Sequence, residues 1–174
     1  MAAEVPQDPS LDPVHSLEEA LQGMVWRREE GLFALLGFPE PPFPADLIAL
    51  SGSGPAQGIR EGGETTLLLP AAEAEAAFLR HPQAQNEGPL VWVRFELPLA
   101  WDLVGFLAHV TGAMERAGIP VGAISGFSRD HLFFAADAWP RAAAVLSNLF
   151  GPPQAPPEAR SVPPIGGAAP PRAR

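Results

Sequence analysis

Three amino acids are missing from this sequence, which contains no cysteine, no lysine and no tyrosine. Without cysteine the chain has no disulfide framework, no thiolate nucleophile and no thiolate ligand for zinc or an iron–sulfur cluster. Without lysine it has no Schiff-base residue, no lysine general base and no phosphate-loop lysine. These absences exclude several large classes of enzyme.

Positive charge is also scarce. The chain carries 11 basic residues, all arginines, against 20 acidic ones, which gives a net charge of −9. Nucleic acids and anionic membranes are bound through clusters of positive side chains, and no segment gathers the arginines in that way. We therefore expect neither nucleic acid nor a membrane as a partner.

Long apolar runs are absent as well. No run approaches the roughly 18–20 residues of a membrane-spanning helix. The N-terminal sequence MAAEVPQDPS has no basic start followed by an apolar block, so it does not resemble a secretory signal. These features predict a cytoplasmic protein, and a hydrophobic content of 47% supplies material for a packed core.

Residue types used in catalysis are present, but they form no catalytic motif. Neither G-x-S-x-G nor H-E-x-x-H occurs. His131, which follows Asp130, lacks the further ligands that a metal needs, so we expect it to be a structural histidine of a hairpin. The four tryptophans are expected in core or edge packing. The sequence thus predicts a protein that is not an enzyme and holds no metal or cofactor.

Both ends of the chain are rich in proline. Residues 1–14 hold three prolines, and residues 151–174 hold eight with no aromatic residue. Such segments bury too little apolar surface to offset the entropy of ordering them, so both are predicted to be disordered tails. Pro153 to Pro156 fits a PxxP pattern for SH3-like grooves, but a solvated tail is the preferred reading.

Hydrophobic spacing and turn residues predict the elements of the first half. Ser16 and Glu19 form a capping box, which marks the start of a helix. Pro70 suits a helical first turn because its missing N–H would be unpaired there anyway. The predicted elements are a helix from residue 16, a strand at 31–38, an irregular segment at 39–64 with a short strand near 47–50, a strand at 65–69, a helix at 70–79 and a linker at 81–89.

The second half has clearer signals. Gly118 is placed to close one helix, and Asp137 is placed to cap the next. The predicted elements are a strand at 90–97, a helix at 102–117, a strand at 120–125, a tight reversal at 126–130, a strand at 131–134 and a helix at 138–149. Two α-β-β-α blocks thus flank a central strand, as in an internal repeat. This order predicts an α+β fold with antiparallel sheets and helices on one face.

Four short motifs in the second half occur in a fixed order. Asp102-Leu103-Val104-Gly105 fits D-x-x-G, and Ala117 to Val121 reads AGIPV. Ile124-Ser125-Gly126 follows, and Asp130 to Phe133 reads DHLF. On these motifs residues 88–150 resemble an ACT domain, a regulatory fold that binds amino acids beside many metabolic enzymes. The DHLF hairpin is similar to that of small stand-alone tandem-ACT proteins.

The resemblance implies two ferredoxin-like units of the βαββαβ type. Residues 88–150 would form the ACT domain and residues 15–87 a degenerate ACT-like unit, since the latter lack a D-x-x-G motif. No closing strand follows the last helix of the second unit before the proline-rich tail. Strands are therefore expected to be shared between the two units.

The resemblance also implies a ligand site at the loop before the first helix, where it meets a neighbouring unit. The free amides of a helix N-terminus favour a carboxylate, and Gly105 permits close approach. Asp102 is expected to cap the helix or to pair with a ligand ammonium, the cap being the preferred reading. The predicted ligand-binding residues are Asp102, Leu103, Val104 and Gly105, faced by Ile124, Ser125, Gly126 and Phe127.

Two hypotheses follow for function. The first is a non-catalytic regulatory protein that binds a small molecule, most simply an amino acid, and forms a homo-oligomer. The second is an ACT-like scaffold that dimerises or docks on a partner without a metabolite. A stripe on the predicted helix at 102–117, formed by Gly105, His109, Gly112 and Arg116, faces either a partner subunit or solvent.

Overall fold

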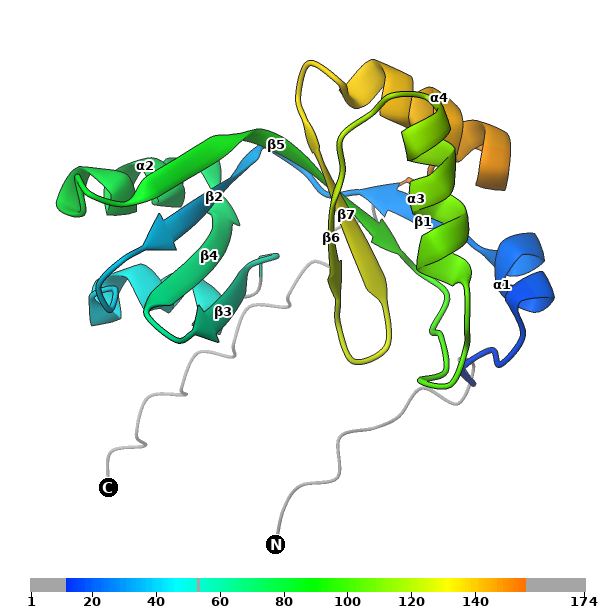
Figure 1. Cartoon of the computed structure of the whole chain (residues 1–174), viewed down its shortest axis with the longest axis horizontal. Coiled ribbons are helices and arrows are strands. Elements are labelled where there is room, and N and C mark those ends of the chain that lie inside the picture. The colour runs from blue at the N-terminus through cyan, green and yellow to red at the C-terminus, as the bar shows by residue number, and fades with distance from the viewer. Residues whose placement is uncertain (1–11, 53, 156–174) are drawn as a thin grey trace, which may run out of the picture.

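A seven-stranded antiparallel sheet runs through the molecule (Figure 1). The computed structural model describes residues 12–52 and 54–155. The strand order is β3-β4-β2-β5-β7-β6, and β1 also pairs with β5. The strands are β1 (Trp26–Arg28), β2 (Phe33–Phe38), β3 (Gln57–Glu61), β4 (Glu64–Pro70), β5 (Gln85–Phe95), β6 (Gly122–Ser125) and β7 (Asp130–Ala135).

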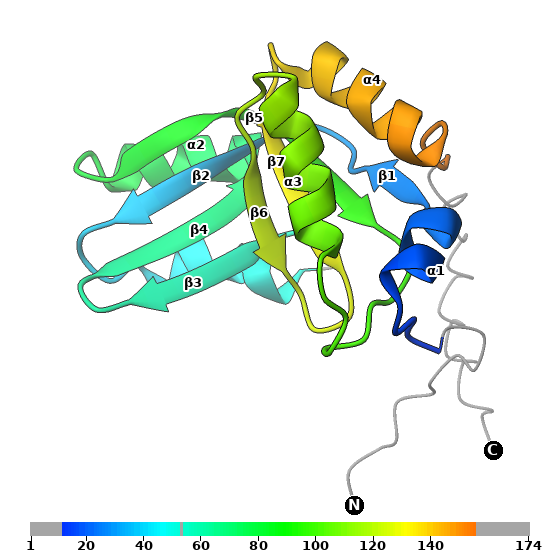
Figure 2. The same ribbon diagram turned by 45° about the vertical axis from the view of Figure 1, so that its right-hand side comes forward.

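Four α-helices and one 3₁₀-helix accompany these strands in the part of the chain described. They are α1 (Leu17–Gly23), η1 (Pro44–Ser51), α2 (Ala71–Arg80), α3 (Phe106–Arg116) and α4 (Trp139–Phe150). Ser16 caps α1 as predicted, because its hydroxyl accepts a hydrogen bond from the Glu19 N–H at 3.2 Å. Figure 2 shows α3 and α4 beside β5, β6 and β7, whereas α2 lies with β2 and β4.

Strand β5 belongs to two ferredoxin-like units. Its first part pairs with β2, and its second part pairs with β7 on one edge and with β1 on the other. The first unit consists of β2, η1, β3, β4, α2 and the start of β5. The second unit consists of the rest of β5 followed by α3, β6, β7 and α4, and β1 takes the place of its missing closing strand. The expected sharing of strands is thus present, and the first unit is inserted into the second.

All helices of both units cover the same face of the sheet. Phe33 of β2 and Leu90 of β5 are register partners, and both belong to one apolar cluster on the helix-free face. Their neighbours Ala34 and Val91 must point to the opposite face, toward α2 and toward α3 and α4 respectively. The α+β fold with helices on one face is confirmed.

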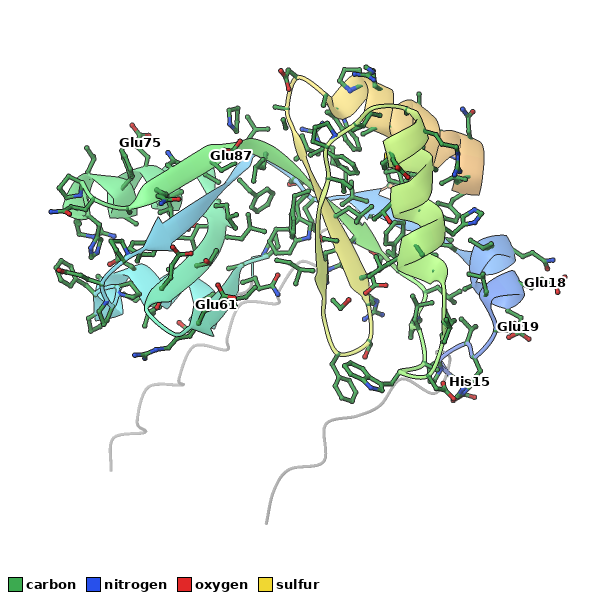
Figure 3. All side chains as sticks on the ribbon, in the orientation of Figure 1. His15, Glu18, Glu19, Glu61, Glu75 and Glu87 are labelled. Carbon is green, nitrogen blue, oxygen red and sulfur yellow. The ribbon has the colours of Figure 1, made fainter. Side chains whose placement is uncertain are left out.

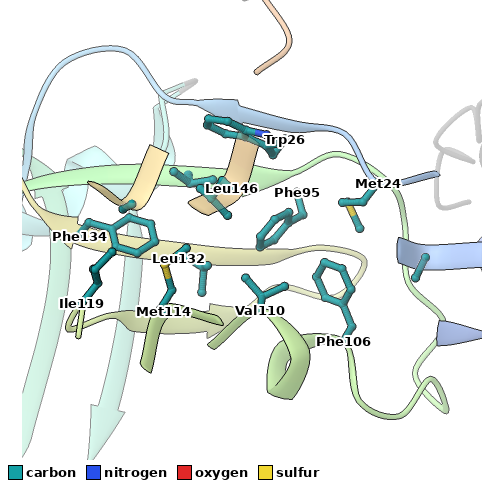
Figure 4. Packing of buried hydrophobic residues seen from close by; sticks show 13 residues of the cluster. Met24, Trp26, Phe95, Phe106, Val110, Met114, Ile119, Leu132, Phe134 and Leu146 are labelled. Atoms are coloured by element: carbon teal, nitrogen blue, oxygen red, sulfur yellow. The ribbon is translucent and has the colours of Figure 1, made fainter. Parts of the chain in front are cut away.

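The core of the second unit lies between the sheet and the helices α1, α3 and α4 (Figure 4). Phe95 and Phe106 meet edge to face with ring centroids 5.0 Å apart, a favourable arrangement for aromatic pairs. Trp26 of β1 is 1% exposed, and its indole N–H donates to the Gly151 carbonyl at 2.9 Å. This contact ties the strand to the end of α4, and Gln154 N–H donates to the Trp26 carbonyl at 2.8 Å.

Several predicted elements differ from the structure. The strand predicted near 47–50 is wrong, because η1 occupies that segment. The segment predicted as a linker at 81–89 is wrong in its second part, since β5 begins at Gln85. The prediction missed β1 and β3 altogether. Asp137 does not cap α4, whose N-cap is Ala138 without a side-chain bond.

The predicted unit and tail boundaries stay predictions. The boundary between residues 87 and 88 falls inside β5. Most of the predicted tails, 1–14 and 151–174, lies outside the described residues, as does Pro156 of the PxxP pattern. Within the described part, Val14 exchanges backbone hydrogen bonds with Pro98 and Ala100.

A buried carboxylate, Asp46, fastens η1 to α2 in the first unit. Its side chain is fully buried and accepts hydrogen bonds from Phe43 N–H and Arg80 Nε, both at 2.9 Å, and from His81 Nε2 at 2.7 Å. Burial alone would raise the pKa of Asp46, but the hydrogen bonds from Arg80, His81 and Phe43 outweigh it and hold the pKa below its usual value. These contacts hold η1 against the end of α2.

Removing the charge of Asp46 is expected to destabilise the protein strongly. In Asp46→Asn, the half-buried Arg80 loses its carboxylate partner, and we expect the free energy of unfolding to fall by about 2 kcal/mol. Urea denaturation at neutral pH measures this change. Glu75→Gln, at an exposed carboxylate of α2, is the control and should change stability by less than about 0.5 kcal/mol. Equal effects of the two variants would contradict the assigned role.

Candidate functional site

The loop between β5 and α3 presents an open helix N-terminus. The N-cap is Gly105, which has φ +102° and supplies no side-chain cap. This left-handed conformation favours glycine. His109 N–H donates to the Gly105 carbonyl at 2.9 Å, so the N–H groups of Phe106, Leu107 and Ala108 precede the first intrahelical bond. They are free for a ligand or water.

Asp102 does not cap α3, and that preferred reading was wrong. The helix begins at Phe106, four residues later than predicted. The Asp102 carboxylate lies instead beside His15, with 3.1 Å between Oδ1 and Nδ1. Both side chains are exposed, and Figure 3 shows His15 at the loop end of the second unit. An exposed pair of this kind contributes little to stability.

A hollow of about 270 Å³ lies between this loop, the start of α3 and the β6–β7 hairpin. We call it the α3 hollow. Its lining residues are Leu99, Ala100, Trp101, Leu103, Gly105, Phe106, Leu107, Ala108, Ser125, Gly126, Ser128, Arg129 and Asp130. Two segments that are about twenty residues apart in sequence thus meet here, as the sequence predicted for the loop and the strand end.

The predicted ligand-binding residues divide into two groups. Leu103, Gly105, Ser125 and Gly126 line the α3 hollow. The other four, which are Asp102, Val104, Ile124 and Phe127, do not line it. Ile124 packs on the helix-free face of the sheet, because side chains alternate along a strand. A ligand-binding role for any of the eight stays a prediction.

Asp130 is the acidic group of this hollow that the sequence prediction left out of the site. Its Oδ1 accepts a hydrogen bond from Ser125 Oγ at 2.6 Å across the β6–β7 pairing. The adjacent Arg129 donates from Nε to the Glu96 carbonyl at 3.0 Å. The motif DHLF contains Asp130, so its place opposite Ser125 was within reach of the sequence. The hollow therefore offers amide donors on one wall and a carboxylate on the other.

Three large apolar side chains are exposed around this end of the second unit. Trp101 is 90% exposed, Val104 84% and Phe127 95%. Trp101 was expected in core or edge packing, and its exposure contradicts that expectation. Trp101 and Val104 come from the loop before α3, and Phe127 comes from the β6–β7 hairpin. Exposed apolar groups that lie together are typical of an interaction surface.

His131 has the structural role that the sequence predicted. The Trp92 indole, which can only donate, gives its N–H to His131 Nδ1 at 3.0 Å. Nε2 must therefore carry the proton of the neutral ring. Burial, followed by the positive charges of Arg94 and Arg129, lowers the pKa of His131 to about 4.

The lowered pKa of His131 predicts an acid response. Between about pH 6.5 and 4 the unfolded chain binds a proton at this residue and the native state does not, so the native state loses stability as the pH falls through that window. His131→Asn keeps an acceptor for Trp92 but does not titrate. In urea denaturation the stability difference between the native protein and the variant should shrink on acidification. Parallel pH profiles would contradict this role.

Neither a cluster of metal ligands nor a membrane-spanning helix is found in the described residues. Within residues 12–52 and 54–155, no group of three or more His, Cys, Asp or Glu side chains is placed to hold a metal ion. Among the helices that the structure describes, none is both long enough and apolar enough to cross a membrane.

The chain matches known proteins through its structure. No protein-family model matches it, and no curated protein matches it. A protein from Agrobacterium tumefaciens matches with a TM-score of 0.60 and 20% identity, over 75% of this chain and 90% of that one. A protein of unknown function from Vibrio cholerae, described as a possible transport protein, gives 0.58 and 21%, over 78% and 95%.

Regulatory domains match as well. The regulatory subunit of aspartate kinase from Thermus flavus matches with a TM-score of 0.51 and 12% identity, over 73% of this chain and 96% of that one. A putative C-terminal regulatory domain of aspartate kinase from Porphyromonas gingivalis gives 0.50 and 12%, over 73% and 95%. Identities this low establish the fold alone, and at that level the chain has the ACT-like tandem fold of aspartate kinase regulatory domains.

Proposed function

We propose that this protein is a non-catalytic regulatory module of the ACT type that binds an amino acid in the α3 hollow. The observation that carries the proposal is the uncapped N-terminus of α3 opposite the Ser125–Asp130 pair. A homo-oligomeric, cytoplasmic protein is part of the same proposal. The fold of regulatory domains and of stand-alone proteins supports it.

The first step is recognition of the ligand carboxylate. Phe106, Leu107 and Ala108 line the hollow, and their N–H groups have no intrahelical acceptor. They also lie at the positive end of the α3 dipole, which favours negative charge. Gly105 suits this position because of its left-handed φ of +102°, and a Cβ there would come within 3.3 Å of the Leu17 side chain.

The second step is recognition of the ligand ammonium. The Asp130 carboxylate lines the same hollow, and its hydrogen bond to Ser125 holds it in place. One wall offers amide donors for the ligand carboxylate, and the other offers an acceptor for the ligand ammonium. Together they fit a zwitterion. The volume of about 270 Å³ lies just below the range of about 300–1,000 Å³ that is usual for ligand pockets, so it suits a ligand as small as an amino acid.

The third step is the regulatory output. The segments that would hold the ligand also carry Trp101, Val104 and Phe127. A ligand that orders these segments favours the arrangement in which they contact a partner. It can shift that equilibrium only by the difference between its affinities for the two arrangements.

Thermal shift against the twenty amino acids, followed by calorimetry, tests the binding site. We expect at least one amino acid to raise the melting temperature at millimolar concentration. Asp130→Asn, which keeps an acceptor for Ser125 but loses the charge, should weaken that ligand at least tenfold, or about 1.4 kcal/mol. Asp137→Asn, at an exposed aspartate between β7 and α4, is the matched control and should bind as the native protein does.

Two results would count against amino-acid binding in this hollow. One is the absence of any stabilisation by the twenty amino acids. The other is a ligand whose affinity is unchanged in Asp130→Asn, because that ligand would bind elsewhere.

The second candidate is a scaffold that uses the same apolar surface without a metabolite. The exposure of Trp101, Val104 and Phe127 favours it. Val104→Asp together with Phe127→Ser should then convert an oligomer into a monomer in analytical ultracentrifugation, whether amino acids are present or not. An oligomer that survives both substitutions rules this surface out. Gly105 is a poor position for the same test because its φ of +102° strains any other residue.

A further inference from the structure

A second, open cavity lies between the two units on the helix-free face of the sheet. It measures about 330 Å³ and is lined by side chains from both units, among them Gln57 of β3, Trp92 and Arg94 of β5, His131 of β7, and Glu29. Strands β3 and β7 lie on opposite sides of β5 in the strand order. They can line one cavity only if the sheet curls with its helix-free face inward. The course of the strands in Figure 1 is consistent with such a curl. We call this cavity the inter-unit cleft.

The same face holds an apolar floor beside the cleft. Phe33, Leu68, Leu90, Trp92 and Phe133 form one buried cluster that spans β2, β4, β5 and β7. The Trp92 ring meets the rings of Phe33, His131 and Phe133 edge to face, with centroids 5.2 to 5.5 Å apart. This packing fixes the positions of the polar groups above it, as a binding site requires.

A network of ion pairs lies beside this floor. Glu96 contacts Arg27 and Arg94, each at 3.0 Å, and Arg129 at 4.0 Å, and Glu29 lies 3.2 Å from Arg94. Of these charged residues, Arg94 and Glu29 line the cleft itself, and their charges cancel.

Two donors remain available at the cleft. Arg94 has five N–H bonds, and its contacts to Glu29 and Glu96 use Nη1, Nη2 and Nε, so at least two N–H bonds are left. The Nε2–H of His131 has no acceptor among the hydrogen bonds of the described residues. It lies beside Gly126, where a Cβ would come within 3.4 Å of Nε2.

We propose that the inter-unit cleft binds a small organic carboxylate, with Arg94 and His131 Nε2–H as its donors and Glu29 and Glu96 as the groups that orient Arg94. Planar guanidinium and carboxylate groups match in geometry. The volume of the cleft falls within the usual range for ligand sites. This site is distinct from the α3 hollow, which lies on the far side of the β6–β7 hairpin and uses backbone amides.

Two tryptophans report on the two sites separately. The Trp92 indole N–H is bonded to His131, so a ligand on Nε2 of the same ring should shift its resonance in an ¹H–¹⁵N NMR spectrum. Trp101 lines the α3 hollow and reports on that site. Trp92→Phe and Trp101→Phe assign the two signals among those of the four tryptophans.

Titration of the full-length protein with succinate tests the proposal. We expect the Trp92 signal to move and saturate at millimolar succinate while the Trp101 signal stays in place. His131→Asn keeps an acceptor for Trp92 but removes the imidazole ring with its Nε2–H donor, so the affinity for succinate should fall at least tenfold. Arg94→Gln should weaken binding similarly, whereas the control Arg60→Gln, at an exposed arginine of β3, should not.

Distinct outcomes overturn the proposal. A Trp92 signal that does not move at tens of millimolar succinate, or an affinity unchanged in His131→Asn, contradicts the site. If Arg94→Gln fails to fold, His131→Asn still decides. A larger response to inorganic phosphate than to succinate contradicts the carboxylate class. A Trp101 response to amino acids is scored separately and leaves this test unaffected.

Discussion

The pairing of β5 on both of its edges is the constraint on which the rest of the structure depends. This strand of eleven residues supplies backbone hydrogen bonds to β2, β7 and β1. Its side chains alternate between a helix-covered face, with Val91 and Val93, and a polar and aromatic face, with Trp92 and Arg94. A slip of one residue would bury Arg94 under α3 and α4 and expose both valines, so the register of one unit also fixes that of the other.

The two units share a topology but differ in the loop and the hollow at the corresponding place. In the second unit, D-x-x-G leads into a full helix, and the loop and the hairpin enclose about 270 Å³. In the first unit, the corresponding loop after β2 contains Pro39 and Pro41 and runs into η1, and the matching hollow at the β3–β4 hairpin has only about 100 Å³. The contacts of Asp46 fasten the short helix in place. The first unit therefore has a smaller hollow at this place, and its loop after β2 also lines a separate pocket of about 230 Å³ with Arg80 and His81.

Local signals in the sequence were sufficient for much of the second unit, because its periodicities are regular and its turns carry Gly118 and the D-x-x-G motif. They failed where long-range pairing decides the structure. Trp26 to Arg28 is a strand only because β5 offers it an edge, and nothing local distinguishes it from the end of a helix. The capping role expected for Asp102 was wrong because the left-handed turn at Gly105 starts the helix three residues after it. The contacts of Glu96 with Arg27 and Arg129 also join residues that are far apart in sequence.

Insertion of the first unit between β1 and β5 has a consequence for how the protein folds. Trp26 pairs with Phe95, so the chain must close a loop of nearly seventy residues to join them. Folding of the inserted unit first would bring the two ends of that loop together through β2 and β5, which removes most of the entropy cost of closure. We therefore expect the inserted unit to fold before β1 pairs with β5. Strand β1 is synthesised early, and it stays unpaired until the second part of β5 has been made. Such non-local pairing slows folding, and an unpaired Trp26 strand would need protection from aggregation in the meantime.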